Sequence, residues 1–153
     1  MSIIGVVGAG AMGSGIAQVA AEAGYNVKIY DVAPNAAEKA LAKLQKAWQK
    51  AVDKEKITAD VMNARVALVK VVGDLADFSD CDLVVEAVAE SIEVKKAVFS
   101  KLDEVCEAKT ILASNTSSLS ITQIGAFTKR PDRVVGMHFF NPVPVMKLIE
   151  IIK

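Results

Sequence analysis

The one histidine of this sequence, His138, has surroundings that suit acid–base chemistry. It ends the apolar run 134–137, which is typical of a buried strand, and open parallel sheets bind ligands at the carboxyl ends of their strands. Glu150 follows twelve positions later within the aliphatic run 148–152, where a carboxylate is costly to bury unless it is paired. Because segment 141–144 holds two prolines that can reverse the chain, we expect the two side chains to meet. Such a pair would orient the imidazole to take a proton from a hydroxyl; the alternative is a strand histidine and an edge-strand glutamate with no shared role.

A second group of residues has the spacing of a dinucleotide-binding turn. Gly8, Gly10 and Gly13 form the pattern G-x-G-x-x-G after an apolar run, and Asp31 follows Gly13 by 18 positions at the end of the next apolar run. Gly8 would permit the tight turn, Gly10 the approach of a pyrophosphate, and Gly13 the close packing of helix on strand. Asp31 would accept the ribose hydroxyls and repel a 2′-phosphate, so the pattern favours NAD over NADP. The alternative is a structural glycine turn with Asp31 as a cap. The predicted cofactor-binding residues here are Gly8, Gly10, Ala11, Met12, Gly13 and Asp31.

Residues 114–120, Ser-Asn-Thr-Ser-Ser-Leu-Ser, follow another apolar run. Hydroxyls and an amide at the carboxyl end of a strand could bind a hydroxyl, a carbonyl or a ribose. We expect Ser118 or Ser120 simply to cap the next helix.

Strand and helix patterns alternate along most of the chain. This alternation predicts an α/β fold of the Rossmann type, with a doubly wound, mostly parallel sheet and helices on both faces. A capping-box pattern, Asn35 with Glu38, opens a long amphipathic helix, and Thr58 caps a shorter one that completes a helical arm. The predicted strands are 2–7, 26–30, 69–72, 83–88, 110–114, 133–138 and 146–152, and the predicted helices include 12–23 and 94–105.

Length and charge restrict the class of protein. The 153 residues suit one domain, and 18 basic against 18 acidic side chains argue against a nucleic-acid binder or a polybasic membrane binder. Residues 1–21 carry no charge, but they hold five glycines and break into strand, turn and helix, so we expect neither export nor a membrane span. The two cysteines, Cys81 and Cys106, are interpreted as core thiols of a reducing compartment, and no metal site is expected. A cytoplasmic protein is the simplest interpretation.

Three segments together resemble the L-3-hydroxyacyl-CoA dehydrogenases, most of all the bacterial 3-hydroxybutyryl-CoA dehydrogenases. They are residues 8–17 (GAGAMGSGIA), 113–119 (ASNTSSL) and 136–148 (GMHFFNPVPVMKL), and the resemblance extends over the whole chain. It implies NAD-dependent oxidation of a short-chain 3-hydroxyacyl-CoA, or the reverse, in fatty-acid or butanoate metabolism.

The resemblance also implies roles for single residues. His138 would be the general base and Glu150 its orienting partner. Ser117 and Asn141 match positions that contact the substrate hydroxyl or the nicotinamide region. Glu90, Lys95 and Asn115 match cofactor-contacting positions. Lysines of the stretch 50–56, including Lys54 and Lys56, lie where the helical arm of the family meets coenzyme A phosphates, although a solvated helix face is an equal alternative.

The family also has an all-helical C-terminal domain that forms the homodimer interface and closes over the acyl-CoA. We interpret residues 1–153 as the NAD-binding domain alone, and we expect cofactor binding to survive better than turnover. Other hypotheses are a dehydrogenase of free 3-hydroxy acids, a non-catalytic NAD-binding module and a structural relative like the lens lambda-crystallins. The segment around His138 argues against the first, because those families use a lysine base.

Overall fold

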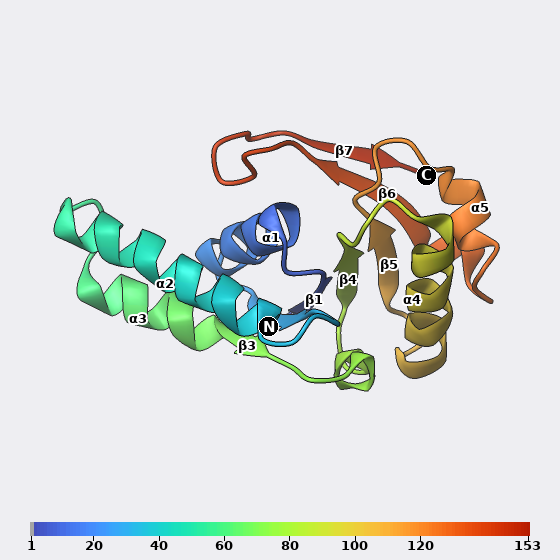
Figure 1. The fold of residues 1–153 in the computed structure, drawn as a ribbon, viewed down its shortest axis with the longest axis horizontal. Helices are drawn as coiled ribbons and strands as arrows, with labels where there is room; N and C mark the ends of the chain where they lie inside the picture. Colours follow the sequence, from blue (N-terminus) through green and yellow to red (C-terminus); the bar gives the residue numbers. More distant parts are fainter. Residues whose placement is uncertain (1) are drawn as a thin grey trace.

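A computed structural model describes residues 2–153 and shows one sheet with helices on both faces (Figure 1). The strand order is β3-β2-β1-β4-β5-β6-β7, all neighbours being parallel except β6 and β7, which are antiparallel. The predicted doubly wound, mostly parallel α/β fold is therefore confirmed. The strands are β1 Ile3–Val7, β2 Asn26–Tyr30, β3 Val69–Val71, β4 Leu83–Glu86, β5 Ile111–Ser114, β6 Val134–Phe139 and β7 Ile149–Ile152.

The strand order reverses between β1 and β4, and a crevice at such a switch point is where open α/β sheets bind their ligands. Both strands lie in the middle of the sheet, and Val6, Val84 and Val85 are almost wholly buried. Apolar residues on both sides of these strands are what a sheet covered on both faces requires.

Helices cover the two faces in separate groups. On one face α1 and α2 pack over a core that contains Ile16, Leu44 and Trp48. On the other face α4 and α5 pack over a core that contains Phe99 and Ile124. The helices are α1 Ala11–Glu22, α2 Ala36–Asp53, α3 Ala59–Leu68, α4 Ile92–Val105 and α5 Ile121–Gly125, with short 3₁₀ turns η1 Leu75–Phe78 and η2 Pro131–Arg133.

The helical arm is present, but one of its predicted caps is wrong. α2 and α3 run side by side away from the sheet (Figure 1), and the Thr58 hydroxyl accepts the Val61 N–H at 3.2 Å as predicted. Asn35 makes no side-chain cap, because its backbone is left-handed (φ 62°) and not in the extended form of a capping residue. Asparagine tolerates that conformation better than most residues, so it serves here as a turn residue.

Two strands are shorter by two residues or more than their apolar runs predict. β4 ends at Glu86, two residues before the expected end, and β7 begins at Ile149, three residues after the expected start. The N–H groups of Val145 and Met146 both donate to the carbonyl of Pro142, and this tight turn delays β7. Among the described residues, no helix is both long and apolar enough to cross a membrane.

The two cysteines lie in the core beneath α4. Cys81 is fully buried and Cys106 nearly so, and both thiols are free. Burial raises the pKa of Cys81 to about 12 and the pKa of Cys106 to about 11. Both are therefore protonated at neutral pH, as the sequence interpretation of core thiols expects.

Candidate functional site

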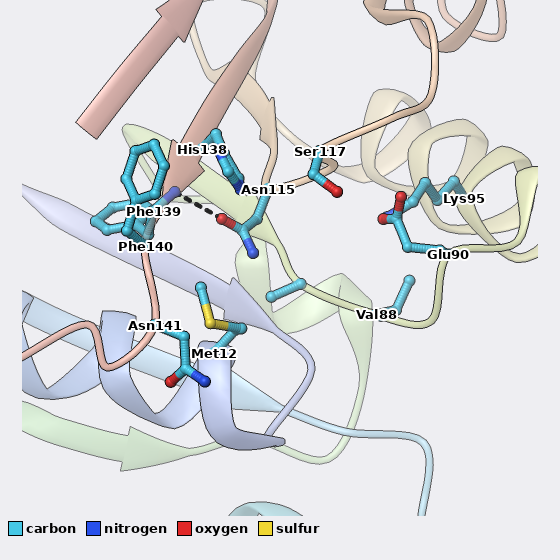
Figure 2. Close-up of a pocket in the computed structure, with 11 residues that line it drawn as sticks. Met12, Val88, Glu90, Lys95, Asn115, Ser117, His138, Phe139, Phe140 and Asn141 are labelled. Carbon is cyan, nitrogen blue, oxygen red and sulfur yellow. Dashed lines mark hydrogen bonds and ion pairs between the residues drawn. The ribbon is translucent and has the colours of Figure 1, made fainter. Parts of the chain in front are cut away.

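A cavity of about 310 Å³ lies at the carboxyl ends of β4, β5 and β6 (Figure 2). It brings together seven of the predicted site residues, although they come from four separate parts of the chain. These are Met12, Glu90, Lys95, Asn115, Ser117, His138 and Asn141. Ala87, Val88, Phe139 and Phe140 complete its wall.

His138 and Glu150 are directly opposite each other in the antiparallel pair β6–β7. Opposed residues have their Cβ atoms about 5 Å apart on the same face of the sheet, so the register makes the two residues cross-strand neighbours. In the described chain no hydrogen bond joins the two side chains, and Glu150 is exposed and does not line the cavity. The His138 ring lies 4.6 Å, centroid to centroid, from the Phe140 ring at a tilt of 60°.

Asn115 connects the end of β5 to the strand that carries His138. Its Oδ1 accepts the backbone N–H of Phe139 at 2.8 Å, drawn as the dashed line in Figure 2. This bond holds the backbone next to His138 in place. The same side chain lines the cavity, so Asn115 can fix the strand with one end of its amide and still meet a ligand with the other.

A buried ion pair lies beside the cavity. Lys95 Nζ is 2.6 Å from Glu86 Oε1, and both side chains are almost wholly buried. Glu86 also accepts the Val88 N–H at 2.8 Å and the Ser114 hydroxyl at 2.7 Å. Three donors to one buried carboxylate are what offsets the cost of removing it from water.

Glu90 extends this network to the serine-rich loop. Its carboxylate is 3.3 Å from Lys95 Nζ, and it accepts hydrogen bonds from the hydroxyls of Thr116 at 2.8 Å and Ser118 at 3.0 Å. Ser117 lies between these two anchors and points into the cavity in Figure 2. Burial by itself would raise the pKa of Glu90, but the hydrogen bond from Thr116 and the charge of Lys95 outweigh it and hold this pKa below its ordinary value.

Sequence reasoning missed Glu86. The signal was present, because Glu86 is a carboxylate inside the apolar run 83–88, the same argument that singled out Glu150. Its partner Lys95 lies nine positions later on α4, so the pair becomes visible only when α4 is packed on the sheet.

The glycine-rich turn lines a second, larger cavity of about 810 Å³ with Asp31. Gly8 has φ +105°, and a Cβ there would lie 2.6 Å from the Ala87 carbonyl oxygen, so the predicted need for glycine in this turn is confirmed. A Cβ on Gly13 would collide with the Gly8 carbonyl, which explains the close approach of α1 to the turn. A Cβ on Gly10 would meet nothing within 4 Å, so the protein itself leaves open space there.

Asp31 bridges two backbone segments at the edge of this cavity. One carboxylate oxygen accepts the Ala9 N–H at 2.7 Å and the other accepts the Ala33 N–H at 2.8 Å. The alternative of a turn cap therefore describes part of what Asp31 does. Its place in the cavity wall leaves its ribose-binding role as a proposal.

The turn and the helix after it have the features that a pyrophosphate requires. α1 begins at Ala11, and Gly10 supplies no side-chain cap, so the first N–H groups of the helix are without the usual side-chain partner. Together with the open space at Gly10, this arrangement fits a dinucleotide phosphate.

Lys54 and Lys56 lie in the exposed turn between α2 and α3, at the far end of the arm from the sheet (Figure 1). Neither residue lines the two cavities. Their predicted contact with coenzyme A stays a prediction.

Three comparisons with known proteins all point to one family. Residues 3–153 match the family described as 3-hydroxyacyl-CoA dehydrogenase, NAD binding domain. A probable 3-hydroxybutyryl-CoA dehydrogenase of Bacillus subtilis is 50% identical over 97% of this chain and 52% of its own length. Crystal structures of 3-hydroxybutyryl-CoA dehydrogenases from Escherichia coli and Ralstonia eutropha superpose with TM-scores of 0.95 and 0.94, at 44% and 40% identity. They cover 98% and 99% of this chain but 32% and 53% of their own, so the chain spans about half or less of the length of these relatives.

Proposed function

Because this chain belongs to the 3-hydroxyacyl-CoA dehydrogenase family through its NAD-binding domain, we propose that it supplies the cofactor site and the proton-transfer residues of that reaction. The reaction is oxidation of a short-chain L-3-hydroxyacyl-CoA to the 3-oxoacyl-CoA, or the reverse. The observation that carries the proposal is the register of His138 opposite Glu150, beside a cavity that Ser117 and Asn141 also line.

NAD is the cofactor of this domain family, and the residues of the larger cavity would hold its nucleotide half. The turn from Gly8 to Gly13 and the start of α1 would bind the pyrophosphate, and Asp31 would accept the ribose hydroxyls. Glu90, Lys95 and Asn115 would surround the nicotinamide half in the smaller cavity. When bound, NAD would supply the acceptor for the hydride that leaves the carbon bearing the substrate hydroxyl.

In the proposed mechanism His138 takes the hydroxyl proton as the hydride leaves the same carbon, so the products are the ketone, NADH and a protonated imidazole. Ser117 and Asn141 hold the substrate oxygen in line with His138. Glu150 lies one strand away on the same face, and rotation of its exposed side chain would bring its carboxylate to the imidazole. The carboxylate would then orient the ring and stabilise the charge that it gains.

The rest of the substrate is proposed to be bound by parts of the protein beyond the two cavities. Lys54 and Lys56 at the tip of the arm would meet coenzyme A phosphates. The relatives are about twice as long as this chain. A helical second domain of the kind that the family resemblance implies would cover the acyl chain and form the dimer. The chain would act in the cytoplasm.

A fluorescence titration of this chain with NADH, beside one with NADPH, tests the cofactor half of the proposal. We expect saturable binding of NADH and at least about tenfold weaker binding of NADPH, because Asp31 would face the 2′-phosphate. A circular dichroism melt of the same sample establishes that the chain is folded. A folded chain that binds neither nucleotide, or prefers NADPH, would contradict the proposal.

His138→Gln tests the chemical half. In the chain joined to the second half that its relatives carry, this variant should bind NADH as before and lose at least about a hundredfold in reduction of acetoacetyl-CoA. Unchanged turnover would exclude His138 as the base.

A further inference from the structure

Two carboxylates and one ammonium lie together at the cavity beside His138. The charge of Lys95 is shared between Glu86 at 2.6 Å and Glu90 at 3.3 Å, which leaves one net negative charge on the cluster. Glu86 is wholly buried, whereas the Glu90 side chain is 44% exposed. The excess charge therefore faces the cavity through Glu90.

We propose that Glu90, supported by the buried Glu86–Lys95 pair, strengthens binding of the oxidised nicotinamide cofactor relative to binding of the reduced one. The inference rests on the proposed function, because it requires the nicotinamide ring to lie in the smaller cavity. It goes further by assigning to Glu90 a selection between two redox states of one ligand.

The physical reason is the charge of the ring. The nicotinamide of NAD⁺ carries a positive charge and that of NADH carries none, while the pyrophosphate, riboses and adenine are the same in both. A carboxylate near the ring attracts only the oxidised form. The ratio of the two dissociation constants therefore isolates the contribution of charge at this end of the cofactor.

The other titratable groups of the cavity wall do not cancel this effect. They are Lys95, whose ammonium is buried and already paired with two carboxylates, and His138, which is the only other ionisable side chain in the lining. Glu90 is held by Thr116 and Ser118 in its present place, so its charge is fixed relative to the cavity before any ligand arrives. A fixed charge needs no reorganisation to act on the bound ring.

The test is to measure the dissociation constants of NAD⁺ and NADH for this chain and for Glu90→Gln by isothermal titration calorimetry. We expect the substitution to weaken NAD⁺ binding about fivefold more than NADH binding, the size of a charge interaction over several ångström near a protein surface. Glu90→Asp keeps the charge and should largely keep the preference.

Glu93→Gln is the matched control. Glu93 lies three positions after Glu90, in the first turn of α4, and lines the larger cavity instead of the smaller one. Its removal takes away the same charge at the nucleotide end, so it should change both dissociation constants by the same factor.

Two results would overturn the inference in different ways. If the unsubstituted folded chain binds neither form, the proposed function fails and the inference fails with it. If it binds both and Glu90→Gln shifts them equally, the inference alone is wrong. Should Glu90→Gln not fold, the dissociation constants of the unsubstituted chain can be measured at about 50 mM and about 500 mM salt. Salt screens the charge on an exposed carboxylate, so it should raise the ratio of the NAD⁺ constant to the NADH constant. An unchanged ratio would contradict the inference.

Discussion

At the scale of single residues, the glycines of the first turn have separate tasks. Gly8 is required by its positive φ and by the nearby Ala87 carbonyl, and Gly13 by contact with the turn itself. Gly10 has an ordinary φ of −73° and open space at the position of a Cβ. The fold therefore explains two of the three glycines, and the third is explained by the proposed ligand.

This difference predicts that alanine at Gly10 affects mainly ligand binding, whereas alanine at Gly8 affects mainly stability. Gly10→Ala should change the free energy of unfolding by less than about 1 kcal/mol, because the lost N-cap preference and the reduced entropy of the unfolded chain are small and opposed. It should weaken NADH binding more than about tenfold, because the methyl group occupies the space for the pyrophosphate. Urea unfolding and fluorescence titration measure the two effects.

Gly8→Ala is the comparison for that variant. It should lower the free energy of unfolding by about 2 kcal/mol or more, since its Cβ meets backbone and its φ is unfavourable. A Gly10→Ala chain that is equally destabilised would show that Gly10 is retained for the fold.

Prediction from sequence succeeded for strand register. His138 and Glu150 are opposite each other on one hairpin, which could be inferred from two apolar runs and two prolines, whereas the pairing of their side chains stays a prediction. It failed for Glu86, whose partner depends on the packing of α4, and it could not foresee that Asn115 holds the Phe139 N–H. Those contacts depend on side-chain placement that no local pattern specifies.

At the scale of elements, α1 packs against the loop between β6 and β7. A Cβ on Gly15 would lie 2.8 Å from the Cβ of Val143, which is buried. In Figure 1 this loop lies above α1 in the view. The same loop carries Asn141, so the absence of a side chain at Gly15 helps to set the position of a proposed substrate-binding residue.

We predict that Gly15→Ala lowers the free energy of unfolding by about 1 kcal/mol. Overpacking costs about 1–3 kcal/mol and exceeds the gain of about 1 kcal/mol from better helix propensity. Gly125→Ala in α5 is the matched control, because its Cβ would meet other atoms only at 3.6 Å or more, so that variant should be as stable as the unsubstituted chain or more stable. Thermal unfolding of both variants measures the difference; equal stability would contradict a tight contact at Gly15.

At the scale of the whole molecule, stability depends on two cores, one on each face of the sheet. The fold class followed from alternating strand and helix patterns, since these specify a parallel sheet with two covered faces. The exact strand ends could not be predicted from these patterns, because the start of β7, for example, depends on the turn at Pro142.

The core beneath α4, which contains both cysteines, makes the free energy of unfolding fall at alkaline pH. Burial holds the pKa of Cys81 at about 12 and of Cys106 at about 11, against an ordinary value of 9.0. Below pH 9 both thiols keep their protons in the folded and unfolded chain, so their contribution is fully present. As the pH rises above 9 the unfolded chain loses these protons first, and the free energy of unfolding decreases until the folded thiols also titrate.

Urea unfolding between pH 8 and pH 10 tests this prediction. The double variant Cys81→Ala with Cys106→Ala should be less stable at pH 8, because it leaves space in the core, and should lose stability less steeply as the pH rises. An identical slope in both chains would assign the alkaline effect to other groups.

The residues that line the two cavities are also synthesised at different times. All residues that line the larger cavity lie between positions 7 and 98, whereas the smaller cavity needs residues up to Asn141. Val98 is the last residue that lines the larger cavity, and His138 follows it by 40 positions. The ribosome therefore adds every residue of the nucleotide half before it adds His138. In each new molecule, the residues proposed to hold the nucleotide half of the cofactor are thus synthesised before the proposed catalytic base.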